Sequence, residues 1–394
     1  MARYTLDWET KTPIKILGEA AKGQAYGKTN YCFQVGDTVH TVVFEFEMLN
    51  TLKSEFKIRP ILVRLTSSGY STEVLADWVS NHSTHPFSHA IRMNRSTDNS
   101  NIVHIAWMCG SRIFYMRGNI IDEEFIDWGA GAQDTGWDAK GNSLTVTSDL
   151  GGFPWLCYAS PDENSIVIRR SSEKAGLFVN DPSGYLQLPS PSAFDFDITQ
   201  LDSGAKMILL YRKKKSLTEC PVYERIYNGS WQDEVDLYWE TNAHALRLGR
   251  CDDRIGVLYA SGPSSIRYRD GDWNGYFSSP EVLPILSTNF IYNLGLARGI
   301  TGGSPLDRWV VFYQEERLPI IQVLAHYQQT HFSKLESFGG GSGFWNYEKF
   351  TGMGILGVEQ IGTDHVACVT LYPVVHESHG DFYYLGALSL KKVV

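Results

Sequence analysis

The 394-residue chain has no apolar run that approaches the roughly 18 residues of a membrane span. Its first 25 residues contain no apolar core of a signal peptide. Positive charge is also in short supply, because 35 Lys and Arg against 44 Asp and Glu leave a net charge of −9. Such a protein repels a polyanion overall. We therefore expect no membrane span and no nucleic-acid partner.

Cysteine is sparse and is never arranged in a CxxC pair, so neither a zinc site nor a thioredoxin-like motif is indicated. The six cysteines are Cys32, Cys109, Cys157, Cys220, Cys251 and Cys368. Several lie in apolar runs, which favours a reducing compartment. Glycosylation sequons at Asn81, Asn94 and Asn228 would matter only in a secreted protein. The compartment and the oligomeric state stay open, and no cofactor is predicted.

Helical periodicity is nearly absent, since no segment places apolar residues at i, i+3, i+4 and i+7 over several turns. What the chain does contain is 13% aromatic residues and 36 glycines. This composition suits many short strands separated by turns. An all-β fold is therefore predicted.

One pattern recurs seven times: an apolar, β-branched run that ends in an aromatic residue, followed by a polar turn and an alternating strand. The runs cover residues 39–46, 102–107, 154–158, 207–211, 254–259, 308–313 and 365–372. Their terminal aromatics are Phe46, Trp107, Tyr158, Tyr211, Tyr259, Tyr313 and Tyr372, spaced 48 to 61 residues apart. A repeat of this length is the size of one four-stranded propeller blade.

We therefore predict a seven-bladed β-propeller that occupies residues 1–394 as a single domain. In the second unit the four strands are expected at residues 88–94, 102–108, 112–117 and 124–128. The ring must close to avoid an unpaired sheet edge, and residues 4–17 are expected to supply the outer strand of the last blade. Six blades with an N-terminal cap is the alternative, because an insertion at residues 48–60 weakens the first unit.

The blade pattern resembles the sialidase-like, or BNR-repeat, propellers. Residues 101–107 followed by 112–117, and 254–259 followed by 265–273, carry the resemblance. The family's Asp-box turn is present only in degenerate form, at residues 228–231 and 269–273. Asn-Gly and Asp-Gly are favoured turn dipeptides in any hairpin. No sialidase catalytic residue can be matched to a position of this chain.

In a propeller, the loops from second to third strands and from outer strands to the next blade share one face, where function usually gathers. The histidines of residues 81–85 and 376–379 are expected on that rim. A histidine can act as a general base, and an arginine can bind a carboxylate. The candidate catalytic residues are His244, Arg247, His85 and His89. The candidate ligand-binding residues are Arg112, Glu315, Arg317, His376 and His379.

No metal site is predicted, because neither histidine pair lies on a helix that would align the rings. The favoured function is recognition of a carbohydrate, since the 11 Trp and 21 Tyr can stack on sugar rings. An enzyme with its pocket at the central channel, acting on a glycan or a small natural-product intermediate, is the alternative. A structural component of a larger assembly is the third. Sites repeated between blades would favour a lectin, and a single central site an enzyme.

Overall fold

The computed structural model describes most of the chain. The described residues are 3–15, 32–48, 56–81, 90–95, 101–140, 144–174, 185–201, 206–216, 219–237, 239, 243–251, 254–261, 265–272, 274–283, 285, 291–298, 309–315, 321–327, 331–338, 355–361, 365–376 and 380–393. All regular structure in these ranges is β-strand. No helix in this part of the chain is long and apolar enough to cross a membrane.

The described strands form seven antiparallel sheets, which we number along the chain. Sheet 1 contains β2 (Phe33–Val35), β3 (Thr38–Met48), β4 (Phe56–Thr66), β5 (Gly69–Val74) and β6 (Val79–Asn81). Sheet 2 contains β7 (Ala90–Arg95), β8 (Ile102–Cys109), β9 (Arg112–Ile120), β10 (Ile126–Asp127) and β11 (Gln133–Asp138). Sheet 3 contains β12 (Thr145–Ser148), β13 (Pro154–Ala159), β14 (Ser165–Arg170) and β15 (Tyr185–Pro189).

Sheet 4 contains β16 (Ala193–Gln200), β17 (Met207–Lys213), β18 (Val222–Tyr227) and β19 (Val235–Asp236). Sheet 5 contains β20 (Ala243–Cys251), β21 (Arg254–Ser261), β22 (Ser265–Gly271) and β23 (Glu281–Val282). Sheet 6 contains β24 (Ile291–Arg298), β25 (Trp309–Glu315), β26 (Ile321–Tyr327) and β27 (His331–Phe338). Sheet 7 contains β28 (Ile355–Ile361), β29 (His365–His376), β30 (Gly380–Val393) and β1 (Arg3–Lys15).

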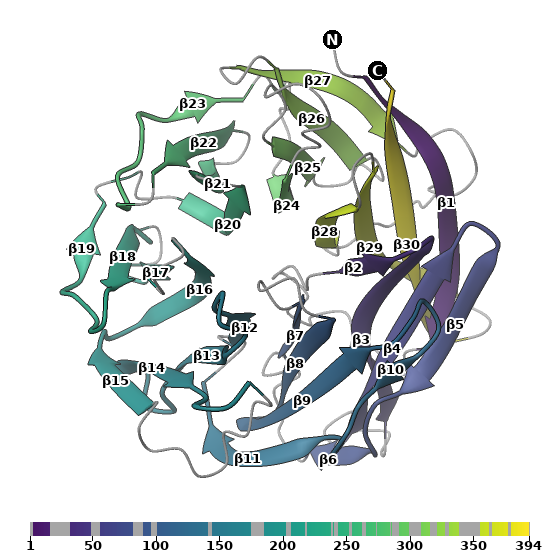
Figure 1. Cartoon of the computed structure of the whole chain (residues 1–394), viewed down its shortest axis with the longest axis horizontal. Helices are drawn as coiled ribbons and strands as arrows, with labels where there is room; N and C mark the ends of the chain where they lie inside the picture. Colours follow the sequence, from purple (N-terminus) through teal and green to yellow (C-terminus); the bar gives the residue numbers. More distant parts are fainter. Residues whose placement is uncertain are drawn as a thin grey trace.

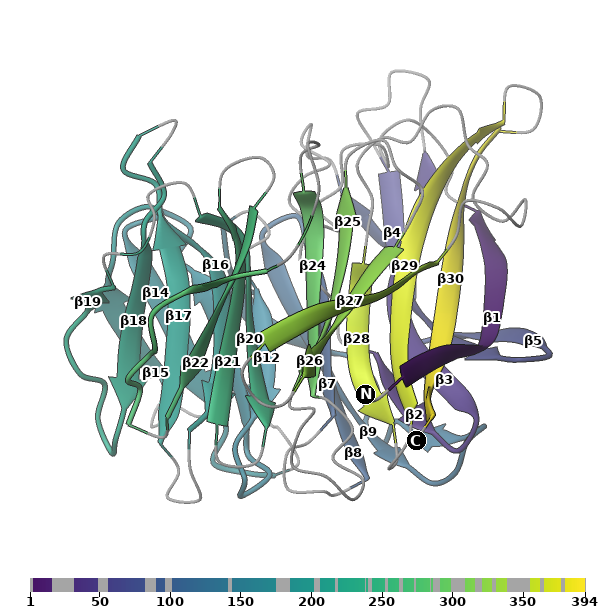
Figure 2. The same cartoon turned by 90° about the horizontal axis from the view of Figure 1, so that it is seen from above.

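The sheets radiate from a common centre, so the prediction of an all-β propeller is confirmed (Figure 1). The innermost strands of sheets 1 to 7 are β2, β7, β12, β16, β20, β24 and β28, and neighbouring inner strands contact one another from β7 through β12, β16, β20, β24 and β28 to β2. The circuit closes where β7 contacts β3 of sheet 1. Seen from the side, the strands run between two faces that carry the loops (Figure 2).

In sheets 2 to 5 the second strand is mostly apolar because both of its faces are covered by neighbouring sheets. Along β13, the side chains of Trp155 and Cys157 pack in a cluster shared with sheet 4, whereas those of Leu156 and Tyr158 pack in a cluster shared with sheet 2. Successive strand residues point to opposite faces, so a continuous apolar run fills two cores at once. This is why the repeated runs were recognisable in the sequence.

The N-terminal strand β1 occupies the outer edge of sheet 7. It pairs antiparallel with β30 from Arg3 opposite Val393 to Lys15 opposite Phe382. The start of β1 and the end of β30 therefore lie side by side (Figure 1). Without β1, the edge of β30 would present unpaired backbone groups, which are a template for aggregation.

Candidate functional site

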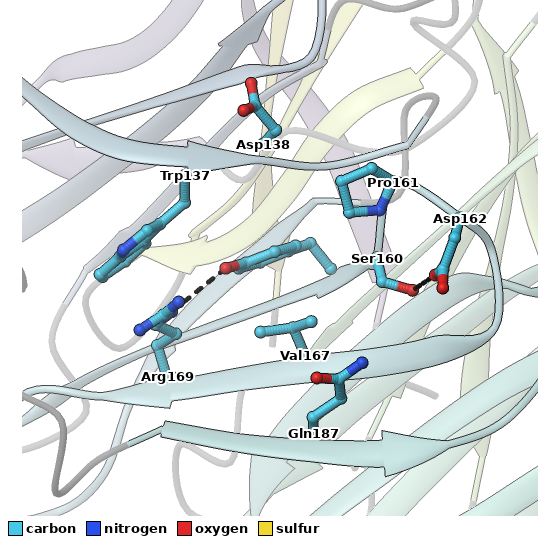
Figure 3. Close-up of a pocket in the computed structure, with 9 residues that line it drawn as sticks. Trp137, Asp138, Ser160, Pro161, Asp162, Val167, Arg169 and Gln187 are labelled. Atoms are coloured by element: carbon cyan, nitrogen blue, oxygen red, sulfur yellow. Dashed lines mark hydrogen bonds between the residues drawn. The ribbon is translucent and has the colours of Figure 1, made fainter.

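A cavity of about 350 Å³ opens at the junction of sheets 2 and 3 (Figure 3). It is lined by Trp137 and Asp138 of β11, Tyr158 of β13, Ser160, Pro161 and Asp162 of the loop that follows β13, Val167 and Arg169 of β14, and Gln187 of β15. None of these lining residues belongs to the inner strand β12. The cavity therefore lies between two sheets, away from the central channel.

The floor of this junction pocket is an ordered set of Trp137, Tyr158 and Arg169. The Nε of Arg169 donates a hydrogen bond of 3.1 Å to the hydroxyl of Tyr158. The guanidinium carbon of Arg169 lies 3.7 Å from the centre of the Trp137 ring. Tyr158 is only 2% exposed, so it anchors the arginine from below. The arrangement combines an aromatic face with a fixed cation.

The wall opposite Arg169 is the turn between β13 and β14 (Figure 3). The carboxylate of Asp162 accepts hydrogen bonds from the hydroxyl of Ser160 and from the backbone N–H of Asn164 at 3.1 Å. The Ser160 hydrogen bond is the main cause that lowers the pKa of Asp162, so this carboxyl is ionised at neutral pH. The backbone N–H of Ser165 donates to the Ser160 hydroxyl at 3.0 Å. The turn is therefore held in one shape before any ligand arrives.

Arg112, a predicted ligand-binding residue, lies beside this pocket at the start of β9. Its Nε donates to Asp134 at 2.7 Å, and its Nη1 lies 3.9 Å from Asp138, which lines the pocket. The hydroxyl of Ser111 also donates to Asp138, at 2.8 Å. Arg112 therefore contributes to the pocket indirectly, through its contact with the lining residue Asp138. The turn before β9 and the turn after β13 both link the second strand of a sheet to the third. Turns of this kind lie on the face where a functional site was predicted from the sequence.

Arg247, a predicted catalytic residue, is 6% exposed on β20. Its Nε donates to the carbonyl of Leu294 at 3.2 Å, and its Nη1 to the carbonyl of Leu246 at 2.6 Å. Leu294 lies on β24, so Arg247 joins the inner strands of sheets 5 and 6. His244 lies on the same strand as Arg247, with its backbone opposite Ala260.

Of the other predicted residues, Glu315 is the last residue of β25 and His376 the last of β29. His85, His89, Arg317 and His379 lie outside the described residues. Within the described residues no group of three or more metal-ligating side chains comes together.

Trp137, Arg169 and Gln187 were not among the site residues predicted from the sequence, and Tyr158 was predicted only as the end of a core strand. A signal for two of them was present. Tyr158, Tyr211 and Tyr259 each lie one or two residues before the end of a second strand, and an arginine follows in the next strand at Arg169, Arg225 and Arg269. Trp137 had no such signal, because it comes from the preceding sheet.

A second hollow, of about 600 Å³, lies between sheet 1 and the turn after β9. Its lining includes Thr38 and Gly69, which begin β3 and β5 directly after the turns that join first to second and third to fourth strands, so it opens at the other end of the sheets. The guanidinium of Arg64 at its wall is paired with Glu73 at 2.5 Å, and Glu73 also accepts the Trp128 indole N–H at 2.9 Å. Arg64 and Glu73 therefore already form an ion pair with each other.

Comparison with protein-family models finds no match for the chain. Comparison with curated proteins finds no match either. Among solved structures, the chain is similar to the polysaccharide lyase Uly1, with a TM-score of 0.56 at 8% identity over 99% of this chain and 100% of the lyase. This likeness concerns the fold.

Two lectins resemble the chain at lower TM-scores. SapL1, solved in complex with alpha methyl fucoside, has a TM-score of 0.45 at 10% identity over 82% of this chain and all of its own. A lectin from Aleuria aurantia, described as a six-bladed β-propeller, has a TM-score of 0.46 at 13% identity over 75% of this chain and 94% of its own.

Proposed function

We propose that this protein is a carbohydrate-recognition propeller and that the junction pocket of sheets 2 and 3 binds a sugar unit. The observation that carries the proposal is the convergence of the Trp137 ring, the Arg169 guanidinium and the Asp162 carboxylate around one cavity of about 350 Å³. Aromatic rings pack on the C–H faces of sugars. Guanidinium N–H groups donate to sugar oxygens, and carboxylates accept from sugar hydroxyls. The volume falls in the range of small-molecule sites.

Preorganisation supports the same proposal. The Arg169 side chain is fixed by Tyr158, and the opposite turn is fixed by Asp162. A ligand that enters this pocket meets groups that have already lost their conformational freedom, which removes part of the entropic cost of binding.

As to architecture, we propose that each of the seven sheets is one blade, that residues 1–394 form one domain, and that the blades are of the sialidase-like type. The continuous contacts between inner strands support the blade count, and the pairing of β1 with β30 supports the single domain. The packing of Trp231, the last residue of the degenerate turn of residues 228–231, against Trp155 of sheet 3 supports the blade type, at a ring-centre distance of 6.3 Å.

An enzyme that acts on a glycan is the second candidate, because a polysaccharide lyase has a similar fold over its whole length. For this candidate we keep His244 and Arg247 as the proposed catalytic residues, helped by His85 and His89. We likewise keep Arg112, Glu315, Arg317, His376 and His379 as proposed ligand-binding residues of the rim.

The test is a screen of the immobilised protein against an array of oligosaccharides, followed by mass spectrometry of each retained glycan after incubation. We expect retention without chemical change, and weaker retention by the Arg169→Lys variant. If new products form and disappear in a His244→Ala, Arg247→Ala double variant, the enzyme candidate replaces the binding one. If no glycan is retained or altered, both candidates fail.

A further inference from the structure

Sheets 3, 4 and 5 repeat one tyrosine and arginine pair at the same register. Tyr158 faces Val167 across the strand pair, Tyr211 faces Tyr223, and Tyr259 faces Arg267. In each sheet the arginine lies two residues beyond that partner. The pairs are Tyr158 with Arg169, Tyr211 with Arg225, and Tyr259 with Arg269.

The geometry of the pair is conserved among the three sheets. The arginine Nε lies 3.1, 3.3 and 3.2 Å from the tyrosine hydroxyl in sheets 3, 4 and 5. Each tyrosine packs in the cluster shared with the preceding sheet, so each pair faces a junction between two sheets. The pairs are three copies of one unit in different surroundings.

At the junction of sheets 3 and 4 a carboxylate of the chain itself lies against the unit and is hydrogen-bonded by its tyrosine, while Nη1 and Nη2 of Arg225 donate to the carbonyls of Gln232 and Pro189. The hydroxyl of Tyr211 donates to Oε2 of Glu234, and Nη2 of Arg225 lies 3.9 Å from the same oxygen. Lys213 donates to Oε1 at 2.7 Å, and the Ser190 hydroxyl donates to Oε2 at 2.7 Å. Burial opposes ionisation, but the hydrogen bonds from Lys213, Tyr211 and Ser190 lower the pKa of Glu234. The ionised carboxylate of Glu234 therefore lies against the tyrosine and arginine pair of sheet 4.

At the junction of sheets 4 and 5 the unit is covered by an aromatic ring. Trp239 stacks on Tyr259 with ring centres 5.4 Å apart, and the Arg269 guanidinium carbon lies 4.5 Å from the centre of the Trp239 ring. Trp239 is 7% exposed, whereas Trp137 is half-buried in the floor of the junction pocket. The copy in sheet 3 is the one that faces the junction pocket.

We propose that the junction pocket recognises a sugar that bears a carboxylate, such as a uronic acid, and that this carboxylate takes at Tyr158 and Arg169 the place that Glu234 takes at Tyr211 and Arg225. The inference rests on the proposed function and specifies its ligand. The sugar ring lies against Trp137, and the hydroxyls of the sugar face the turn that carries Ser160 and Asp162.

The acidic residues of the pocket are compatible with an acidic ligand. Asp162 is bound by Ser160 and Asn164, and Asp138 is bound by Ser111 and lies close to Arg112. Both carboxylates therefore have their own donors. Asp162 also lies across the pocket from Arg169 (Figure 3), which leaves the two ends of the cavity with opposite charge. A sugar with a carboxylate at one end and hydroxyls at the other matches this polarity.

The first test compares matched sugars that differ only in the carboxylate: the methyl glycosides of glucuronate and glucose, and of galacturonate and galactose. We expect at least one uronate to bind about tenfold more tightly than its neutral counterpart, because an arginine and carboxylate pair is a strong, directional contact. The Arg169→Lys variant should reduce this preference to about threefold or less, since lysine cannot donate from a planar fork. The matched control is Arg269→Lys in the covered copy, which should leave the preference unchanged.

The outcomes separate the two proposals. If neutral sugars bind as tightly as the uronates, the protein is a carbohydrate binder and the carboxylate inference is overturned. If no sugar in the set and no glycan of the array binds, the proposed function fails, and the inference fails with it.

The second test examines the receptor unit without any sugar. Glu234→Ala removes the carboxylate that lies against Tyr211 at the junction of sheets 3 and 4. Glu234→Gln serves as a second variant if the first does not fold. We expect the melting temperature of Glu234→Ala to fall and to recover by about 2 °C or more in ~100 mM acetate relative to chloride, because acetate binds only the folded state. Wild type should gain less from acetate than Glu234→Ala, because in wild type Glu234 already occupies the site at Tyr211 and acetate can enter only the junction pocket. Equal melting temperatures of the variant in the two salts would show that the unit is no carboxylate receptor.

Discussion

Trp137 and Arg169 come from different sheets and stack on each other, with the guanidinium carbon 3.7 Å from the ring centre. Trp137 belongs to β11 of sheet 2, and Arg169 belongs to β14 of sheet 3. A partly exposed cation–π contact contributes about 0.5–1 kcal/mol. That is small beside the free energy of unfolding of a domain. The contact matters chiefly because it sets the orientation of both side chains in the floor of the pocket.

Replacement of Trp137 by alanine should weaken glycan binding by about tenfold or more, equivalent to ~1.4 kcal/mol, because the stacking face is lost. The melting temperature should change little, since the ring is only half-buried. Isothermal titration with a retained glycan measures the first effect, and calorimetric melting the second.

Trp78→Ala is the matched control for this variant. Trp78 is also half-buried beneath a guanidinium, with the Arg59 carbon 4.4 Å from its ring centre, but it lies beside sheet 1. Its replacement should leave binding unchanged. Equal losses of affinity in the two variants would mean that Trp137 acts through general stability and not as a binding surface.

Much of the fold was predictable from the sequence because the second strands are apolar on both faces. The strand expected at residues 102–108 is β8 (Ile102–Cys109), and the one expected at 112–117 is β9 (Arg112–Ile120). Buried runs of this kind leave a signal in any single sequence. The outer strands were harder: β10 covers only Ile126–Asp127, and a further strand, β11, pairs with β9. Outer strands are half-exposed, so their composition constrains them less.

The junction pocket was not predictable in the same way. Trp137 and Arg169 meet only because two sheets pack side by side, and no periodic pattern encodes which residues of adjacent sheets come into contact. Tyr158 illustrates the difficulty, since one buried ring serves both the core and the pocket. The sequence shows an arginine in the strand that follows each tyrosine, but that this arginine lies two residues past the tyrosine's partner is visible only once the strand register is known.

Glu224 on β18 should make the protein less stable as the pH rises. It is 8% exposed, one of its carboxylate oxygens has no hydrogen-bond partner among the described residues, and burial raises its pKa from 4.5 to about 7. The unfolded chain releases this proton above pH 4.5, whereas the folded protein keeps it until about pH 7. Stability is therefore lost across this window, by roughly 2–3 kcal/mol between pH 5 and 8.

Denaturant unfolding of wild type and Glu224→Gln at pH 5 and pH 8 measures this effect. The glutamine variant cannot ionise, so its stability relative to wild type should be greater at pH 8 than at pH 5 by the stated amount. The same difference between the two proteins at both pH values would contradict the assignment.

His40 should make the protein less stable in acid. It is fully buried on β3, and burial, helped by the positive charge of Arg64, lowers its pKa from 6.5 to about 4. Below pH 6.5 the unfolded chain takes up a proton that the folded protein does not bind until about pH 4. The expected loss of stability between pH 7 and pH 5 is about 2 kcal/mol.

Replacement of His40 by phenylalanine removes this titration. The variant loses the 3.1 Å hydrogen bond to the Glu123 carbonyl, so it should be less stable than wild type at pH 7. The ring remains suited to the stacked contact with Phe33. The diagnostic quantity is the change in unfolding free energy from pH 7 to pH 5, which should be smaller in His40→Phe. An undiminished change would place the acid sensitivity elsewhere.

Removal of β1 should open the ring. Deletion of residues 1–17 eliminates a pairing that runs from Arg3 to Lys15 along β30 and exposes the edge of that strand. We expect a fall in melting temperature of about 10 °C or more and aggregation on heating, because an unpaired edge of this length is a template for other strands. A synthetic peptide of residues 1–17 added in trans should restore part of the loss, whereas a scrambled peptide of the same composition should not. An unchanged melting curve would mean that sheet 7 is stable with β28, β29 and β30 alone and that the ring does not depend on its N-terminal strand.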